Sequence, residues 1–583
     1  MMVLYIVSFK DGENIGNSVT FGPTIFIRRG QKMNNKKIHN GGVCLLSVLL
    51  ALVLSGANSS FADVRLPAII GDNMVLQRGQ AAVIWGWAEP NETITVSWRK
   101  PSPGGGSWNS DSRQTTAGKD GKWMVKIEPP TAADSASSPQ ARPYEMTISG
   151  KNTIVLKNIL VGEVWICSGQ SNMEMGIGLV NNARQEIAAA DYPQIRLFHV
   201  ALRSSGQPQT DVEGSWKVCS PENISTGNIW EGWPKGFSAV AYFFGRELHK
   251  ELGVPVGLIC SAWGGTPIEP WTPPVGFTLV EELADMTKQI EQADVEYQKE
   301  IQKAIGQFEQ WEAAAKKALE EGKTAPSPPA WPKHALDNSK KPTGLYNAMI
   351  HPLAPFAIRG AIWYQGEANL ADGMRYCEKM KALIGGWRKV WGQGDFPFYY
   401  VQLAPYRYRW GPPSPYRLPE IWKAQTTALS IPNTGMAATI DISDLDDIHP
   451  KNKQGVGRRL ALWALAKTYG RSELIYSGPA YKSMAVEGDK IRISFDHIGS
   501  GLTTGDGREP TWFEIADEDK NFVQAQAKIE DDTVVVWSDK VPKPAMVRFG
   551  WHEEAEPGLM NKEGLPAWPF RTDDWPVIMV DKK

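Results

Sequence analysis

The sequence predicts an α/β protein with a mostly parallel central sheet, preceded and followed along the chain by β regions. Between residue 159 and about residue 470, continuous apolar runs alternate with helical patterns, which is typical of parallel strands covered on both faces. From 63 to about 158, and from 471 to 583, short β-rich runs are separated by turn signals. These two observations predict an α/β domain at 159–470 between an N-terminal and a C-terminal β domain.

Length and composition narrow the class of protein. A chain of 583 residues exceeds what one hydrophobic core usually serves, so several domains are expected. The hydrophobic fraction of 42% and the charged fraction of 22% exclude a wholly disordered chain. The net charge of −2 disfavours a nucleic-acid partner. The 24 Trp residues are compatible with sugar stacking, but burial in large β cores is the more frequent use of an indole.

Residues 1–62 are expected to form a signal peptide region. The apolar run at 43–54 is too short to span a bilayer as a helix. Two lysines precede it, and small residues at Ser60 and Ala62 suit the −3 and −1 positions of a cleavage site. Met33 is a possible true start of the protein. Cleavage after Ala62 would send the mature chain to the periplasm or out of the cell, without a membrane anchor.

Short patterns predict the individual elements. Strands are expected at 82–87 and 93–98 in the N-terminal β domain, for which a small sandwich is expected. In the central domain, continuous apolar runs predict buried strands and amphipathic stretches predict helices. These strands are expected at 164–167, 256–260, 360–364 and 398–402, and the helices at 240–252 and 375–391. The C-terminal β domain is expected to contain strands at 490–495 and 532–537.

A charged helical insertion interrupts the central domain at 279–322. Its apolar residues recur every three or four positions, which predicts an amphipathic helix. A helix of about forty residues would span about 60 Å, so a helical hairpin and a single long arm both remain open. A Pro-rich stretch at 326–332 ends the pattern. Packing is the expected purpose of the insertion, and a lid over the site is the alternative.

Three short polar blocks each follow an apolar run. They are Gly-Gln-Ser-Asn-Met at 169–173, Trp-Tyr-Gln-Gly-Glu-Ala-Asn at 363–369 and Asp-Leu-Asp-Asp-Ile-His-Pro at 444–450. Loops that follow the carboxyl ends of parallel strands are where α/β folds place ligands. Each block alone is a weak signal, but the three in this order favour a catalytic site.

The residue types in these blocks suit acyl transfer. Ser171 on a tight turn would expose its Oγ, and its own backbone N–H can face a developing oxyanion. A carboxylate two or three residues before His449 lets one loop supply both a general base and the acid that orients it. Gln365 and Asn369 offer amide donors, and Gly366 allows a close approach of the backbone.

With these blocks in order, the sequence resembles the sialate O-acetylesterase family of SGNH hydrolases. Four stretches carry the resemblance. They are the blocks at 169–173 and 363–369, together with Trp-Gly-Gly-Thr-Pro-Ile-Glu at 263–269 and Asp-Ile-His-Pro-Lys-Asn-Lys-Gln-Gly-Val-Gly at 447–457. Shorter likenesses at 74–78 and 564–571 extend the resemblance over nearly all of 63–583. The resemblance implies a flavodoxin-like α/β/α esterase core, flanked by β domains, that acts on O-acetylated sugars.

The resemblance also implies a nucleophile, a base and an acid. Ser171 matches the nucleophile of the family, and His449 matches its catalytic base. Two residues compete for the acid. The superfamily pattern D-x-x-H selects Asp446, whereas the spacing frequent in this family, with the Asp two residues before the His, selects Asp447.

The oxyanion donors are implied in the same way. Gly264 and Gly265, in the segment at 263–269, match the family's glycine pair, and the backbone N–H of Gly265 or Gly264 would serve as a donor. The wider superfamily has an Asn donor in the stretch that corresponds to 363–369, where this chain offers both Gln365 and Asn369. Gln365 is the first choice because it is nearest the end of the strand. Two more residues of the matched blocks are candidates for oxyanion or substrate binding: Gln170 and Glu367.

These residues predict a two-step ester hydrolysis through an acyl-enzyme. The reaction needs no metal or organic cofactor, and the expected partner is an O-acetylated sugar or glycan rather than a nucleic acid or a membrane. The alternative substrate is an acetylated plant polysaccharide such as acetylated xylan. A non-catalytic glycan-binding protein is less favoured, because nucleophile, base and acid are all present. A lipase is disfavoured because the insertion is its only candidate for an apolar surface helix.

Overall fold

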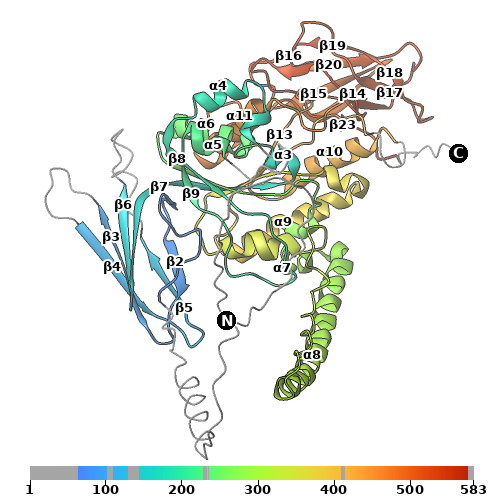
Figure 1. Cartoon of the computed structure of the whole chain (residues 1–583). Helices are drawn as coiled ribbons and strands as arrows, with labels where there is room; N and C mark the ends of the chain where they lie inside the picture. The colour runs from blue at the N-terminus through green and yellow to red at the C-terminus, as the bar shows by residue number, and fades with distance from the viewer. Residues whose placement is uncertain are drawn as a thin grey trace, which may run out of the picture. The chain divides into compact units, whose positions relative to one another are not determined.

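The computed structural model describes residues 63–100, 109–128, 143–226, 233, 235–408 and 414–575. The expected signal peptide region lies outside the described residues. From Ala62 onward the chain forms one compact unit. In Figure 1 an N-terminal β region, a layered α/β region and a C-terminal β region follow one another along the chain. Among the described residues, no helix is both long enough and apolar enough to cross a membrane.

A mostly parallel sheet forms the centre, with the strand order β13-β12-β11-β7-β10-β8-β9. Its neighbours pair in parallel, except that β9 runs antiparallel to β8. The bounds are β7 Thr153–Gly169, β8 Tyr192–His199, β9 Trp216–Cys219, β10 Val256–Ala262, β11 Gly360–Tyr364, β12 Phe398–Val401 and β13 Thr434–Ala437. The predicted parallel sheet is thus confirmed, and the four strands expected in the central domain all belong to it.

The order of these strands places the ends of three of them together. In chain order, β7, β10, β11, β12 and β13 are arranged 2-1-3-4-5, and the β8–β9 hairpin extends the edge beside β10. Strand β7 therefore lies between β10 and β11, where the chain switches from one side of the sheet to the other. Doubly wound sheets bind ligands beyond the carboxyl ends of the strands at such a switch point.

Helices cover both faces of this sheet (Figure 1). On one face, helices α6 (Ala239–Leu252) and α11 (Lys453–Trp463) pack against each other and the strands. On the other lie α7 (Pro274–Thr278), α9 (Arg375–Trp391) and α10 (Arg417–Thr427). Trp165 packs against Phe244 of α6, with ring centroids 5.0 Å apart, whereas Trp363 packs against Trp387 of α9 at 6.2 Å. These three indoles are fully buried, so they serve the core.

Strand β7 joins the N-terminal β region to the central sheet. Its first part pairs with β6, and its second part, buried at every residue from Ile159 to Gly169, pairs with β10 and β11. The expected boundary between residues 158 and 159 therefore falls inside a single strand. One continuous strand therefore contributes both to the N-terminal antiparallel sheet and to the central parallel sheet.

The N-terminal β region contains an antiparallel sheet with the order β4-β3-β6-β7 and a separate β2–β5 pair. A short strand, β1, pairs in parallel with β7. The bounds are β1 Val75–Gln77, β2 Ala82–Trp87, β3 Thr93–Lys100, β4 Asn109–Thr116, β5 Lys122–Ile127 and β6 Tyr144–Ser149. The two strands expected here, at 82–87 and 93–98, correspond to β2 and β3.

The C-terminal β region has its own hydrophobic core, which includes Ile493, Val536 and Phe549. Its two larger sheets have the orders β14-β15-β20-β19 and β18-β17-β21-β23, and β16 pairs with β22. The bounds are β14 Ala480–Glu487, β15 Lys490–Asp496, β16 Leu502–Thr504, β17 Phe513–Ala516, β18 Val523–Gln524, β19 Gln526–Glu530, β20 Thr533–Trp537, β21 Met546–Phe549, β22 Leu559–Asn561 and β23 Phe570–Arg571. The strands expected at 490–495 and 532–537 are β15 and β20.

The insertion is one long helix rather than a hairpin. Helix α8 runs from Ala284 to Glu320, a length of about 55 Å, and projects from the central region (Figure 1). Only three of its residues are buried, and its apolar stripe packs mainly on the extended segment that returns toward the core. In that contact, Trp311 Nε1 donates to the carbonyl of Pro326 at 2.8 Å, and the rings of Phe308 and Trp331 are 5.9 Å apart.

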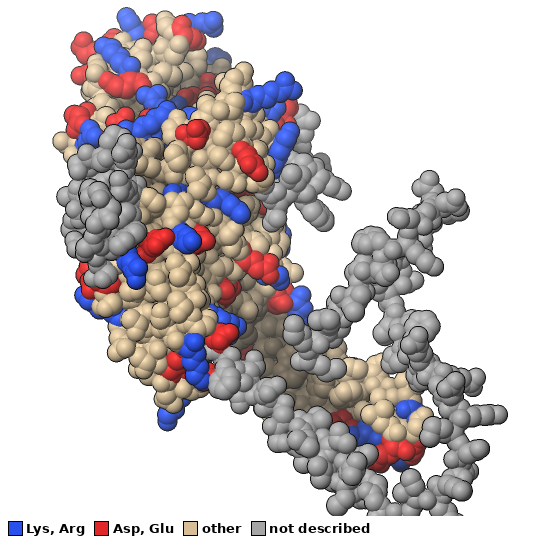
Figure 2. Space-filling model, turned by 60° about the vertical axis from the view of Figure 1, so that its left-hand side comes forward, with Lys and Arg blue, Asp and Glu red and all other residues tan. Residues whose placement is uncertain are grey.

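Charged side chains of both signs are interspersed over the face of the described residues that Figure 2 shows. This distribution agrees with the small net charge of −2. Many of the pairs are exposed, as for Arg113 with Asp111 and Lys316 with Glu312. Exposed pairs of this kind contribute little to stability.

Candidate active site

Ser171 lies on a tight turn directly after β7. The strand ends at Gly169, whose φ of +143° suits glycine; a Cβ there would lie 2.2 Å from the carbonyl oxygen of Tyr364 on β11. The N–H of Gln170 donates to that carbonyl at 3.0 Å. Ser171 then begins a single helical turn, α3 (Ser171–Glu174). The close approach of β7 and β11 thus fixes where the serine emerges from the sheet.

His449 is within hydrogen-bond distance of the serine. Its Nε2 lies 2.9 Å from Ser171 Oγ, although the two residues are 278 positions apart in the chain. The histidine sits in the loop between β13 and α11, and Asn452 caps that helix by accepting from the N–H of Gly455 at 3.0 Å. Burial, assisted by the charge of Lys453 and opposed by Asp447, lowers the pKa of His449. A neutral imidazole can accept the proton of the serine.

The structure distinguishes the two candidate acids by their partners. Asp447 Oδ1 lies 3.6 Å from His449 Nδ1 and accepts a 2.9 Å hydrogen bond from the backbone N–H of the same histidine. Asp446 turns away and pairs with Arg407, whose Nη1 lies 2.8 Å from Asp446 Oδ1. The side chain of Asp446 is 70% exposed. Only Asp447 is therefore positioned to orient the imidazole.

The glycine turn after β10 lies against the serine. A Cβ on Gly264 would be 3.3 Å from the Cβ of Ser171. The N–H of Gly264 is already engaged, because it donates to Glu174 Oε2 at 2.8 Å. The backbone N–H groups of Gly265 and Ser171 donate to no acceptor among the residues that the structure describes. Of the two glycines expected from the sequence, Gly265 is the one whose N–H is available to an oxyanion.

The carboxylate of Glu174 organises this side of the site. Besides the N–H of Gly264, its Oε2 accepts from Trp233 Nε1 at 3.2 Å. The ring centroid of Trp233 is 4.8 Å from that of His449, so the indole covers the imidazole. Burial raises the pKa of Glu174. Glu174 directly follows the Gly-Gln-Ser-Asn-Met block, but nothing in the sequence connected it with a glycine ninety residues later.

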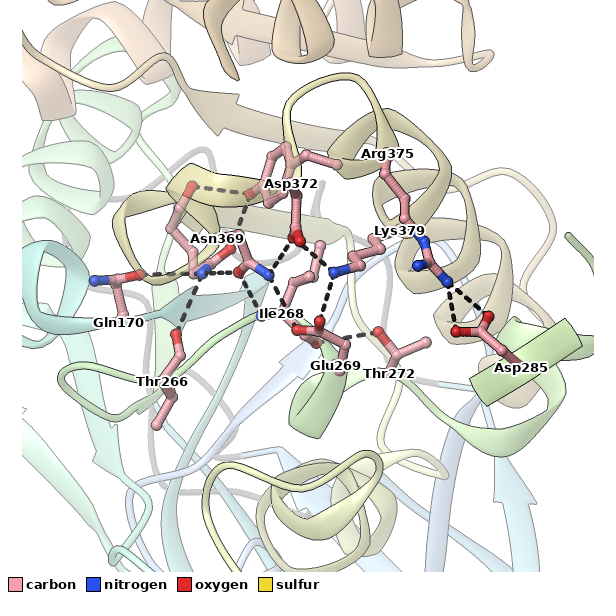
Figure 3. Close-up of polar contacts among 12 residues, drawn as sticks. Gln170, Thr266, Ile268, Glu269, Thr272, Asp285, Asn369, Asp372, Arg375 and Lys379 are labelled. Atoms are coloured by element: carbon pink, nitrogen blue, oxygen red, sulfur yellow. Dashed lines mark hydrogen bonds and ion pairs between the residues drawn. The ribbon is translucent and has the colours of Figure 1, made fainter. Parts of the chain in front are cut away.

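The amides of Gln365 and Asn369 belong to one buried hydrogen-bond network, and Figure 3 shows the part around Asn369. Gln365 Nε2 lies 3.0 Å from Gln170 Oε1, 2.7 Å from Asn369 Oδ1 and 3.2 Å from the carbonyl of Thr266. Gln365 is fully buried and Asn369 is 4% exposed. The expectation that Gln365 donates to the oxyanion meets a physical obstacle, because its N–H groups already have acceptors.

The amide of Asn369 is held on its far side by charged groups. Its Nδ2 donates to Asp372 Oδ2 at 2.7 Å and to Glu269 Oε2 at 3.1 Å. The same two carboxylates accept from Lys379 Nζ, each at 2.6 Å (Figure 3). Asn369 Oδ1 also accepts from the N–H of Ile268 at 2.9 Å. Asn369 therefore joins the block at 363–369 to the segment at 263–269, and both N–H groups of its amide already have acceptors.

Gln170 is the remaining candidate for a side-chain amide donor. Its Oε1 accepts from Gln365 Nε2 at 3.0 Å and from the N–H of Ala368 at 3.2 Å, which fixes the orientation of the amide. Its Nε2 points away from that network (Figure 3) and donates to no acceptor among the described residues. Gln170 is 3% exposed, so its side chain is held in place by the residues around it.

Glu367 bonds to Asn172, the residue after the serine, rather than to Ser171 or His449. Its Oε1 accepts from Asn172 Nδ2 at 2.5 Å, and burial raises its pKa. Lys453, in the run that follows His449, donates to Asn172 Oδ1 at 2.5 Å. Sequence reasoning assigned no role to Asn172 or Lys453, although both lie inside the matched blocks. Both are buried polar residues that need partners, but the sequence alone does not show that they are buried.

Comparison with known proteins identifies the family. The family model described as carbohydrate esterase, sialic acid-specific acetylesterase, matches residues 161–306 and 329–465. These ranges contain Ser171, Gly265 and His449. Together they cover most of the central sheet, most of helix α8 and all of helix α11.

Two kinds of relative support the match. The sialate O-acetylesterase of Rattus norvegicus is 31% identical over 483 residues, which span 78% of this chain and 82% of the rat protein. That of Homo sapiens is 32% identical over 461 residues, or 75% of this chain and 77% of the human protein. The crystal structure of a carbohydrate acetylesterase from Xanthomonas citri gives a TM-score of 0.70 at 34% identity, covering 88% of this chain and all of that chain. The chain is therefore an esterase and belongs to the sialate O-acetylesterase family of carbohydrate esterases.

Proposed function

We propose that this protein removes O-acetyl groups from sugars through Ser171, His449 and Asp447, on a flavodoxin-like core of the SGNH-hydrolase type. The observation that carries the proposal is the 2.9 Å separation of Ser171 Oγ, just after β7, from His449 Nε2, in the loop after β13. The 2-1-3-4-5 order of the five strands supports the core assignment.

In the first step, His449 Nε2 takes the proton of Ser171 as Oγ attacks the acetyl carbonyl. The imidazolium that forms is stabilised by Asp447, whose Oδ1 lies 3.6 Å from Nδ1. This separation is longer than a hydrogen bond, and such contacts commonly tighten when substrate binds. His449 then returns the proton to the sugar oxygen, and the deacetylated sugar leaves. The acetyl group stays on the serine as an ester.

The oxyanion of each tetrahedral intermediate is assigned to three donors. They are the backbone N–H groups of Ser171 and Gly265 and the side-chain amide of Gln170. The absence of any other acceptor for these groups among the described residues supports the assignment. Preorganised donors stabilise a transition state because they need no rearrangement as the charge develops.

In the second step, water attacks the acetyl ester. His449 removes a proton from the water, and the collapse of the intermediate returns that proton to Ser171 Oγ and releases acetate. Apart from the acetylated sugar and this water, no other reactant is needed to balance the two steps. The same residues therefore complete the cycle and regenerate the free serine.

The substrate class follows from the relatives. Mammalian relatives are named sialate O-acetylesterases and the Xanthomonas citri relative a carbohydrate acetylesterase, so an O-acetylated sugar is the shared chemistry. We assign a sialoside as the first candidate and an acetylated plant polysaccharide as the alternative. Export through the region 1–62 is also part of this proposal, since glycans of both kinds are met outside the cytoplasm.

Acetate release separates the candidate substrates. The chain from Asp63 is incubated with a 9-O-acetylated sialoside and with acetylated xylan, and free acetate is measured. We expect release from the sialoside, and a loss of more than about 10³-fold in Ser171→Ala because the nucleophile is gone. Release from xylan alone would keep the mechanism and change the substrate. Release from neither, with intact fold, would contradict the proposed function.

Paired substitutions test the choice of acid. Asp447→Asn should lower kcat by on the order of 10²–10⁴-fold, because the imidazole loses the group that fixes its tautomer. Asp446→Asn is the matched control one residue away. It should change kcat less than about fivefold, since an exposed ion pair is worth about 1 kcal/mol or less. Steady-state kinetics on one acetyl ester decide the matter, and the reverse ranking would select Asp446.

The oxyanion assignment of Gln170 is tested with Gln170→Glu. This change keeps the Oε1 that accepts from Gln365 and replaces the donor Nε2 by a second acceptor. We expect kcat to fall by about 10²–10³-fold with little change in KM, as for the loss of one oxyanion donor. A variant that keeps wild-type kcat would show that Gln170 donates nothing to the transition state.

A further inference from the structure

A buried lysine lies beneath the loop that carries His449. Lys453 is the first residue of α11, and none of its surface is exposed. The only hydrogen-bond acceptor of its ammonium among the described residues is Asn172 Oδ1, at 2.5 Å. The ammonium also lies 5.1 Å from the centroid of the Tyr364 ring, at the end of β11. Burying an ammonium with one hydrogen bond is costly, so a purely packing role would be better served by an apolar side chain.

The acceptor of this lysine joins the nucleophile turn to the histidine loop. Asn172 directly follows Ser171, and its Nδ2 donates to the carbonyl of Ile448 at 3.0 Å. Ile448 directly precedes His449. The same Nδ2 donates to Glu367 Oε1 at 2.5 Å. Every polar atom of the Asn172 amide is thus engaged, and the lysine fixes which way that amide faces.

Glu367 supplies the opposite charge. Glu367 as a whole is half-buried, but its Oε2 is buried and has no hydrogen-bond partner among the described residues. The amide of Asn172 therefore stands between a buried ammonium and a buried carboxylate. Such an arrangement keeps the pair of buried charges neutral overall. It is still less stable than an apolar replacement would be, unless its hydrogen-bond geometry is excellent.

We propose that Lys453 is a positioning residue for acyl transfer, which acts through Asn172 and the Ile448 carbonyl to hold His449 against Ser171. The inference rests on the proposed role of His449 as the base. It adds to that role an electrostatic effect, because a positive charge close to the imidazole disfavours the imidazolium form. Lys453 would then keep His449 in its neutral form down to lower pH. Removing Lys453 would hold the His449 loop less firmly and would also remove this electrostatic effect.

The groups that face the imidazole set the sign of the effect. Asp447 lies on the Nδ1 side, Ser171 Oγ on the Nε2 side, and the Trp233 ring over one face, with Glu174 behind the indole. Asp447 raises the pKa of His449, whereas burial and Lys453 lower it. Burial lowers the pKa of Lys453 itself to about 7, and the pKa of His449 is lowered from its ordinary value, so the lysine is mostly charged on the acidic side of neutrality.

The test is the pH dependence of kcat/KM in Lys453→Met, measured on the chain from Asp63 with an acetyl ester. Activity needs neutral His449, so losing the lysine charge should move the acidic limb to higher pH. For a shift of one pH unit, kcat/KM on that limb falls about tenfold more than on the plateau. The plateau kcat should fall too, because the loop is less well held.

Two further variants keep the test decisive. Lys453→Met with Glu367→Gln removes both buried charges, so it should fold where the single variant does not, and its acidic limb should still be displaced. Lys379→Met removes a buried lysine from the network of Figure 3, which does not contact His449. It should lower thermal stability without moving the limb.

The outcomes separate this inference from the function on which it rests. A wild-type acidic limb in the double variant would overturn the role of Lys453, even if Ser171→Ala is inactive. An equal displacement in Lys379→Met would also overturn it, because the effect would then follow from any loss of a buried lysine. Full activity in Ser171→Ala would instead overturn the proposed function itself.

Discussion

The contact between β7 and β11 at Gly169 is the constraint on which the site depends. Because no side chain separates the two strands there, the chain leaves β7 directly over the end of β11, and Gln170 bonds to the carbonyl of Tyr364. This places Ser171 above the switch point of the sheet. The glycine turn after β10 and the loop after β13 then approach the serine from either side, and two buried polar networks hold them there.

Much of the fold could be predicted because its strongest signals are local. The apolar run at 360–364 is β11, and the amphipathic stretch at 375–391 is α9. The features of the fold that could not be predicted depend on contacts between residues that are distant in the chain. The continuity of β7 through residue 158 reflects its two sets of neighbours, which lie far away in the chain. Similarly, an amphipathic pattern of forty residues is the same for a hairpin and for one arm, so α8 required the structure.

The site shows the same division between local and distant information. Residue types and spacing brought forward Ser171 and His449, which the structure holds 2.9 Å apart. The choice between Asp446 and Asp447 could not be predicted from the sequence. It depends on Arg407, which is distant in the chain and pairs with Asp446. Gln365 was favoured because it is nearest the end of the strand, yet its N–H groups already donate to Gln170 and Asn369. Availability of a donor is a property of the whole network.

Covalent labelling tests the central claim, that Ser171 is a nucleophile activated by His449, most directly. The chain from Asp63 is treated with a fluorophosphonate, which reacts with activated serines, and the adduct is located by peptide mass spectrometry. The account predicts one adduct, on Ser171, that forms much more slowly in His449→Ala and is prevented by acetylated sugar. An adduct on another residue, or labelling of Ser171 at the same rate without His449, would contradict it.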